Sequence, residues 1–296
     1  MKTPPAGCSE VKSNAAAPMR LGQLIAIGIV ALPGAAGPAA QAQGDATKQS
    51  TSPAPPTVEI FAAGSLRGVV GDLAKETDST LHIEVKASFG GSGSMRERIE
   101  KGETPDMLMS ADLGSPRKLE SQGRTVVPVI AFARNRICVV SRRSAGITAQ
   151  NLVEHMLAKD VRIKTSTPIV DPSGDYAWAI FDRIDALHPG AGAKLKGKAQ
   201  AVMNVSATPA PGQSAAAALF ATKQIDMSIT YCSASDTLEK EIPELTSLVI
   251  PPQLDPHPVY GLAVLSDKPQ ALRVALFLLS EKGQAIIARN GLVPHE

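Results

Sequence analysis

The chain has 296 residues, of which 44% are apolar and 20% charged, so it can bury a core and does not have the composition of a disordered chain. Aromatic residues make up only 3%, which argues against the stacking platforms that bind single-stranded nucleic acid. Residues 1–42 carry Lys2, Lys12 and Arg20 against Glu10, which accounts for the whole net charge of +2. The remainder is neutral and offers no attraction for a polyanion, so we expect no binding to nucleic acid.

The N-terminal segment has the pattern of a secretory leader. An apolar run at positions 21–32 follows Arg20, and Ala40-Gln41-Ala42 fits a cleavage site between small residues. The run is too short to cross a bilayer as a helix, which needs about 20 residues. We therefore predict a signal peptide over residues 1–42, with Met19 as an alternative start. A flexible tether rich in Ser, Thr, Pro and Ala is predicted over residues 43–57.

After the tether, strand-like apolar runs alternate with helical patterns, which predicts an α/β fold with mostly parallel strands. In this first part we expect strands at 58–63, 82–85 and 107–110. Helices are expected at 66–76, 95–101 and 116–123, because apolar residues recur there at helical spacing. Gly102 is the expected stop of the second helix.

Two further strands, at 136–141 and 259–265, enclose a second α/β stretch, and residues 269–294 are strongly helical. This order predicts two α/β lobes joined by two crossing strands. The first lobe is discontinuous, with residues 58–137 and 258–296, and the second spans 138–257. A cleft between two lobes is a usual place for a ligand. Cys138 and Cys232 could pair in an oxidising compartment, and the sequence leaves their pairing open.

Four loops of small residues run directly into a predicted helix, two in each lobe: residues 63–66, 90–94, 172–177 and 211–214. A helix N-terminus offers unpaired N–H groups and a partial positive charge, and a serine adds a hydroxyl donor. Any one such loop is ordinarily just a capped helix end, and Asp175 is expected to be only a cap. The four together predict an anion site that uses neither Lys nor Arg.

An enzyme is the alternative, because Gly90-Gly91-Ser92-Gly93-Ser94 nearly matches the nucleophile elbow of serine hydrolases. The final glycine of that motif is missing. No histidine stands in a context that marks it as a base; the candidates are His155, His188, His257 and His295. The chain also lacks a His/Cys pair at metal-ligand spacing and a phosphate-binding loop for ATP. We therefore expect a binding protein rather than an enzyme, with Ser92 as a hydrolase nucleophile the less favoured reading.

The chain resembles the periplasmic molybdate-binding proteins of ABC transporters, a family of two-lobed type II periplasmic binding proteins. The resemblance covers residues 58–293. It rests on FAAGSL (61–66), SFGGSGS (88–94), RIEKG (98–102), PDMLMSAD (105–112), Asp171-Pro172 and IDMSITY (225–231). The phrase PDMLMSAD, with the serine loop upstream of it, is the most specific of these segments.

The resemblance implies a periplasmic protein that captures molybdate, or tungstate, and delivers it to an ABC permease in the inner membrane. It implies no cofactor and no separate metal site, and we expect a monomer. Ser65 and Ser92 would donate hydroxyl and backbone N–H groups from the first lobe. The second lobe would contribute the backbone N–H groups of Ala177 and Gln213 and the hydroxyl of Tyr231.

Five positions depart from the family pattern, and at two of them, Gly64 and Gly91, a small residue is replaced by a smaller one. Tyr176 stands where the family usually has Pro, Gln213 stands where it often has Val, and Arg67 directly after Ser65 is unusual. These departures leave open a preference for another small anion such as sulfate. A role in sensing rather than import also stays open. A site with neutral donors only should discriminate against phosphate, which near neutral pH keeps a proton that needs an acceptor.

Overall fold

The computed structural model describes residues 55–295. The predicted signal peptide (1–42) and all but the last few residues of the tether lie outside this range. This range contains ten helices, ten strands and two short 3-10 turns. The strands form two separate mixed sheets. The predicted α/β, two-lobed architecture is confirmed, with one sheet in each lobe. The prediction of mostly parallel strands was wrong, because five of the eight strand pairs in residues 55–295 are antiparallel. None of the helices in residues 55–295 is long and apolar enough to cross a membrane.

The first sheet has six strands in the order β10-β4-β9-β3-β1-β2. The strand β1 is parallel to β2 and β3, whereas β9 runs antiparallel to β3 and β4. The bounds are β1 Thr57–Ala63, β2 Glu84–Gly90, β3 Met107–Ser110, β4 Ile130–Arg134, β9 Val259–Val264 and β10 Val293–Pro294.

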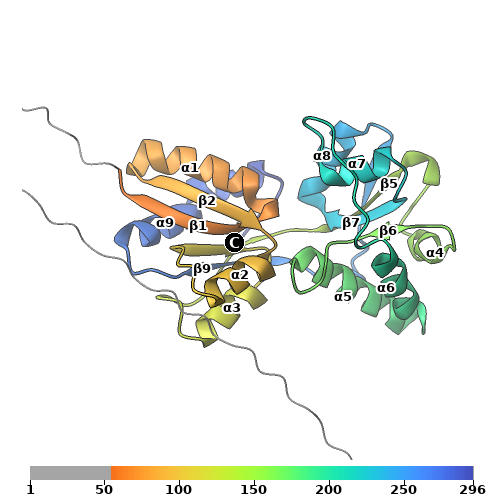
Figure 1. Ribbon diagram of the computed structural model, residues 1–296, viewed down its shortest axis with the longest axis horizontal. Coiled ribbons are helices and arrows are strands. Elements are labelled where there is room, and N and C mark those ends of the chain that lie inside the picture. The colour runs from red at the N-terminus through yellow and green to blue at the C-terminus, as the bar shows by residue number, and fades with distance from the viewer. Residues whose placement is uncertain (1–54, 296) are drawn as a thin grey trace, which may run out of the picture. The chain divides into compact units, whose positions relative to one another are not determined.

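Helices cover both faces of this sheet (Figure 1). The side chains of β1 alternate between the two faces: Ile60 packs in the core with α1 and α9, whereas Phe61 packs with Met95 of α2 and Leu119 of α3. The helices of this part are α1 Arg67–Leu81, α2 Ser92–Glu100, α3 Gly114–Ser121, α9 Pro269–Leu279 and α10 Glu281–Arg289.

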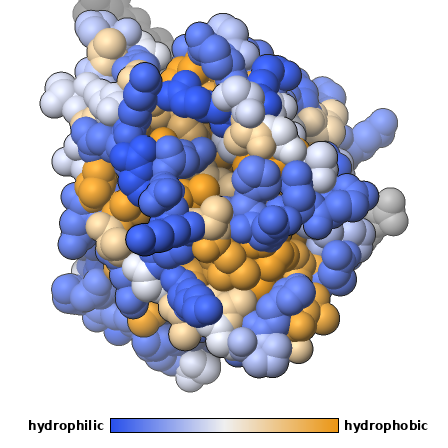
Figure 2. Space-filling view, turned by 90° about the vertical axis from the view of Figure 1, so that its right-hand side faces the viewer, coloured by the Kyte–Doolittle hydropathy of each residue, from blue (hydrophilic) through white to orange (hydrophobic). Residues whose placement is uncertain are grey.

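The second sheet has four strands in the order β6-β7-β5-β8, with β6 parallel to β7 and β5 antiparallel to both of its neighbours. Its strands are β5 Ile137–Arg142, β6 Ile163–Lys164, β7 Met227–Tyr231 and β8 Leu245–Val249. Its helices are α4 Leu152–Leu157, α5 Pro172–Leu187, α6 Ala191–Ala201, α7 Ala215–Ala221 and α8 Cys232–Glu241. Figure 2 shows the molecule from this side, where an apolar area is surrounded by hydrophilic side chains.

The chain passes between the two sheets twice, through Asn135-Arg136 and through residues 250–258. The predicted crossing strands at 136–141 and 259–265 are therefore β5 and β9, each of which belongs to one sheet only. Cys138 of β5 and Cys232 of α8 form a disulfide, which settles the pairing that the sequence left open. The bond is possible because β5 pairs with β7 and Cys138 lies opposite Thr230, close to the start of α8.

Two helices begin earlier than predicted, and both lie at the candidate site. The helix α2 starts at Ser92 rather than at Met95, so most of the small-residue loop forms the first turn of the helix. The helix α5 starts at Pro172, so the segment 172–177, predicted to be a loop before the helix, forms its first turns; proline is in the first turn, where its missing N–H costs nothing. The cap of α5 is Asp171, which accepts from the N–H of Ser173 at 3.0 Å. The prediction that Asp175 is the cap was wrong.

Candidate functional site

The carboxyl ends of three parallel strands bring Ser65, Ser92 and Ala111 to one edge of the first sheet. Each residue follows its strand, β1, β2 or β3, by one or two positions. Parallel strands end at the same edge of a sheet, and ligands of open α/β sheets bind outside that edge. The shared edge explains why loops distant in sequence meet.

Ser92 is fully buried in the first turn of α2. Its Oγ accepts a hydrogen bond from the backbone N–H of Ala111 at 3.0 Å, so its own proton remains available to another acceptor. Ser92 and Gly93 are the first two helical residues, and their N–H groups have no acceptor within the helix. This helix end therefore presents a hydroxyl and backbone amides together.

Ser65 lies in the short 3-10 turn Gly64–Leu66, between β1 and α1. Its Oγ is 3.0 Å from the hydroxyl oxygen of Tyr260 in β9. The Tyr260 hydroxyl accepts from the side-chain amide of Asn135 at 3.0 Å, and the same amide donates to the Oγ of Ser233 in α8 at 2.9 Å. A hydrogen-bonded chain therefore runs from α8 to Ser65 through a residue of the first crossing segment.

Tyr231, at the end of β7, lies beside two other tyrosines. Its ring centroid is 5.7 Å from that of Tyr260 and 6.3 Å from that of Tyr176. Its hydroxyl is buried and makes no satisfactory hydrogen bond to any of residues 55–295. Burial raises the pKa of Tyr231 well above its ordinary value, so the group stays protonated and can donate.

Tyr176, in the first part of α5, completes this cluster. Its hydroxyl donates to the carbonyl of Ala111 at 3.2 Å, the residue whose N–H binds Ser92. Burial, followed by the charge of Asp112, raises the pKa of Tyr176. The chain has only three tyrosines, and all three lie in this cluster. Sequence reasoning selected Tyr231 alone of the three as a ligand residue.

A second contact joins the two lobes at the start of α2. The N–H of Ser94 donates to the carbonyl of Val170 at 3.3 Å. A Cβ added at Gly91 would lie 2.2 Å from that carbonyl oxygen, and one at Gly93 would lie 1.8 Å from the carbonyl oxygen of Ile169. Glycine is therefore required at both positions, because the backbone before α5 packs directly on them.

The other two predicted residues have partners within their own segments. Ala177 is fully buried as the sixth residue of α5, where its N–H falls within the ladder of intrahelical bonds. The N–H of Gln213 donates to the carbonyl of Ala210 at 2.9 Å, and its side-chain oxygen accepts from the N–H of Ala210 at 3.2 Å. Contact of these two amides with a ligand stays a prediction from the resemblance.

Carboxylates also lie near the tyrosine cluster, which the sequence did not predict. Burial raises the pKa of Asp171, and the neighbouring charge of Asp112 raises it further. Burial likewise raises the pKa of Asp175, whose carboxylate accepts from the N–H of Ile169 at 2.8 Å. The site therefore combines neutral donors with carboxyl groups whose ionisation is disfavoured.

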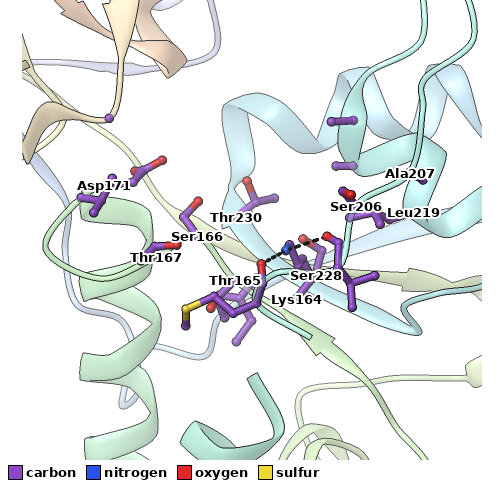
Figure 3. Close-up of a pocket in the computed structure, with 17 residues that line it drawn as sticks. Lys164, Thr165, Ser166, Thr167, Asp171, Ser206, Ala207, Leu219, Ser228 and Thr230 are labelled. Atoms are coloured by element: carbon purple, nitrogen blue, oxygen red, sulfur yellow. Dashed lines mark hydrogen bonds between the residues drawn. The ribbon is translucent and has the colours of Figure 1, made fainter. Parts of the chain in front are cut away.

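A cavity of about 450 Å³ adjoins the cluster at the carboxyl ends of β6 and β7 (Figure 3). Gly91, next to Ser92, and Thr230, next to Tyr231, both line it. Among residues 55–295, most of the other polar groups that line it are Ser and Thr hydroxyls, and Lys164 is the one cationic residue.

The described residues hold no group of three or more His, Cys, Asp or Glu side chains that could bind a metal ion. The hydrogen bonds of Ser92 also bear on the hydrolase alternative. The partner of its Oγ is the N–H of Ala111, and no histidine of residues 55–295 hydrogen-bonds to it. A serine nucleophile needs a base within hydrogen-bond reach. The geometry gives this alternative no support.

Comparisons with solved structures show where the fold recurs. A periplasmic molybdate-binding protein of Azotobacter vinelandii superposes with a TM-score of 0.61 at 18% identity, covering 81% of this chain and 100% of that one. The sulfate-binding protein SubI of Mycobacterium tuberculosis gives a TM-score of 0.65 at 14% identity, covering 81% and 88%. At these identities the likeness establishes the two-lobed fold alone.

The sequence comparisons establish the family. An uncharacterized protein of Pasteurella multocida is 32% identical over 242 residues, which cover 80% of this chain and 98% of that protein. The family profile named "Bacterial extracellular solute-binding protein" matches residues 58–293, almost the whole of the described part. The chain belongs to the bacterial extracellular solute-binding proteins.

Proposed function

We propose that this protein captures a tetrahedral oxyanion, molybdate or tungstate first, and delivers it to an ABC permease in the inner membrane. The observation that carries the proposal is the buried hydroxyl of Tyr231, which has no partner within residues 55–295 and lies in the same cluster as Ser65 and Ser92. Leaving such a donor unpaired costs about 1–3 kcal/mol. An anion bound there would accept its proton.

The directions of the hydrogen bonds leave the hydroxyl protons of Ser65 and Ser92 available to a ligand. Because the Tyr260 hydroxyl accepts from Asn135, its own proton can bond to Ser65 Oγ, which leaves the Ser65 proton for a ligand. The hydroxyl proton of Ser92 is also available to a ligand, since the Ser92 Oγ accepts from the N–H of Ala111. With the amides that begin α2, these hydroxyls form a set of neutral donors of the kind that suits an anion at a helix N-terminus.

Such a donor set favours anions that carry no proton. Phosphate near neutral pH retains one, and the carboxylate beside the cluster that could accept it, Asp171, already accepts from the N–H of Ser173 and the side chain of Ser166. We expect phosphate to bind roughly tenfold to a hundredfold more weakly than the best dianion, from the ~1–3 kcal/mol cost of an unpaired buried group. Sulfate is the second candidate, because it is a proton-free dianion and one structural neighbour binds it.

Calorimetry with molybdate, tungstate, sulfate and phosphate tests the ligand class, and the variant Ser92→Ala tests the site. We expect Ser92→Ala to weaken the best ligand by about 1.5–3 kcal/mol, the range for a hydrogen bond to a charged group. Ser121→Ala is the matched control, because Ser121 is exposed on α3 and bonds only to the carbonyl of Lys118. Tightest binding by phosphate, or unchanged affinity in both Ser65→Ala and Ser92→Ala, would contradict the proposal.

Export and transport need separate observations. N-terminal sequencing of the secreted protein should find a mature end close to Ala42, and retention of the whole chain in the cytoplasm would contradict export. A permease gene and an ATPase gene beside this gene favour import. Their absence, together with a neighbouring sensor gene, would favour the sensing alternative.

A further inference from the structure

The cavity beside the tyrosine cluster is larger than an inorganic oxyanion requires. Its volume is about 450 Å³, which lies within the roughly 300–1,000 Å³ of small-molecule pockets. A tetrahedral oxyanion has only five non-hydrogen atoms and would fill a small part of that space. The size of the cavity therefore suggests a ligand with more atoms than an oxyanion.

Hydroxyl groups from several segments line this cavity. Residues Thr165 to Thr167 follow β6, Ser228 and Thr230 lie on the same face of β7, and Ser206 comes from the loop after α6 (Figure 3). The Oγ1 of Thr165 is buried and has no hydrogen-bond partner within residues 55–295, and Thr165 as a whole is only 3% exposed. Like the hydroxyl of Tyr231, it is a buried polar atom that a ligand group would satisfy.

The cavity carries no cation that is free to bind a second anionic group. The ammonium of Lys164 donates to the carbonyls of Val202, Met203 and Val205, which uses its three protons. Figure 3 shows two of these bonds. These carbonyls follow the end of α6, where a positive charge is stabilising. The one charged group besides Lys164 is the carboxylate of Asp171, which would repel an anion.

The remaining lining is apolar and includes Met203, Ala207 and Leu219. Hydroxyls interspersed with apolar side chains, without a free charge, match an uncharged carbon chain that bears hydroxyl groups. Gly91 lines the cavity directly before Ser92, and Asp171, which also lines it, is close enough to Tyr231 for its charge to raise the pKa of that hydroxyl. A ligand that extends from the tyrosine cluster would therefore enter this space.

We infer that the cavity is a second compartment of the same binding site. The site accepts a phosphate monoester of a small polyol, with the phosphoryl group at Ser65, Ser92 and Tyr231 and the hydroxylated carbon chain at Thr165 and Ser228. This inference rests on the proposed function. A phosphate monoester suits the neutral donors better than inorganic phosphate, since its second pKa is about 6 and it is largely a proton-free dianion above that pH.

Calorimetry with glycerol 3-phosphate, methyl phosphate and molybdate tests the inference. The two organic probes share the phosphoryl group and differ in the polyol. We expect glycerol 3-phosphate to bind at least about tenfold more tightly than methyl phosphate, and to displace molybdate competitively. Thr165→Val should remove most of that difference while it leaves the affinities for molybdate and methyl phosphate unchanged.

Two further variants complete the experiment. Ser228→Ala tests the same compartment from β7, in case Thr165→Val does not fold. Thr77→Val is the control, because Thr77 is fully buried in α1 and bonds to the carbonyl of Ala74, away from the cavity. Equal affinities for the two organic probes alongside tight molybdate binding would overturn this inference and leave the proposed function intact. If neither molybdate, tungstate, sulfate nor the esters bind, the proposed function fails as well.

Discussion

The side-chain amide of Asn135 donates a hydrogen bond to the hydroxyl of Tyr260 at 3.0 Å. Asn135 lies in the first crossing between the sheets, and Tyr260 lies in β9, directly after the second crossing. The Tyr260 hydroxyl is in turn 3.0 Å from the Oγ of Ser65. The segments that connect the two lobes are therefore bonded to a predicted ligand residue, so a hinge movement and occupation of the site would affect each other.

Tyr260→Phe tests this relationship. The change keeps the buried ring but removes the hydroxyl that orients Ser65, and Asn135 still has Ser233 as an acceptor. We expect molybdate affinity to fall by roughly five- to tenfold, equivalent to about 1–1.5 kcal/mol, the upper part of the range for one neutral hydrogen bond. Calorimetry measures this loss. The same affinity in Tyr260→Phe and the unchanged protein would show that Ser65 does not need this bond.

Tyr231→Phe should change stability and affinity in opposite directions. Without ligand, the variant loses a buried hydroxyl that has no partner among the described residues, so its free energy of unfolding should rise by about 1 kcal/mol. That corresponds to roughly 2–4 °C in the melting temperature for a domain of this size. Affinity for the best dianion should fall by about 1.5–3 kcal/mol, because a hydrogen bond to a charged group is lost.

Calorimetric melting and titration of Tyr231→Phe measure these two effects. A lower melting temperature without ligand would mean that the hydroxyl already has a structural partner. Tyr176→Phe is the comparison, since its hydroxyl donates to Ala111 and its loss should lower stability.

The sequence was sufficient to predict that the loops containing Ser65 and Ser92 both belong to the first lobe. Apolar runs before Gly and Ser predict a strand ahead of each loop, although the strand predicted at 82–85 overlaps only the start of β2 (Glu84–Gly90). The parallel order of β1 and β2 places Ser65 and Ser92 at one edge. The starts of α2 and α5 were missed because Gly, Ser and Pro were interpreted as loop residues, although the first turn of a helix tolerates them.

Tyr260 and Asn135 could not have been found from local patterns. Within the apolar strand β9, Tyr260 has the sequence context of an ordinary core aromatic. Its bond to Ser65 joins residues 195 positions apart, and no periodicity reports such a contact. The same holds for the disulfide, which depends on β5 and β7 being neighbours in the second sheet.

Gly93→Ala tests the contact between α2 and the segment before α5. The added methyl group would lie 1.8 Å from the carbonyl oxygen of Ile169, so the two lobes could not approach as they do here. We expect molybdate affinity to fall at least about tenfold, since closure around the ligand is prevented. Small-angle scattering should show a larger radius in the presence of ligand than for the unchanged protein.

Gly71→Ala is the control for this variant, because a methyl group added at Gly71 would have no atom within 4 Å and alanine favours the helix α1. It should keep full affinity and a normal closed radius. A Gly93→Ala protein that binds molybdate normally would show that this contact is not part of the ligand-bound state.

We expect ligand binding to depend on pH because of the carboxyl group of Asp171. Burial, followed by the charge of Asp112, raises the pKa of Asp171 above its ordinary value. A dianion bound beside this group raises its pKa further, so binding is coupled to uptake of a proton. Affinity for sulfate, which keeps its double charge over this range, should therefore increase as the pH falls toward and through the raised pKa of Asp171, and decrease as the pH rises.

Asp171→Asn separates this effect from that of Asp175, whose pKa is also raised by burial. Asparagine also caps helices, so α5 should keep its start while the charge is lost. The variant should bind sulfate more tightly than the unchanged protein near neutral pH, and its affinity should vary less with pH. Titrations between pH 4.5 and 8, roughly the range in which a raised carboxyl pKa acts, measure both profiles. Parallel profiles would assign the dependence to another group such as Asp175, whereas weaker binding by Asp171→Asn at all pH values would mean that the carboxylate helps to hold the ligand.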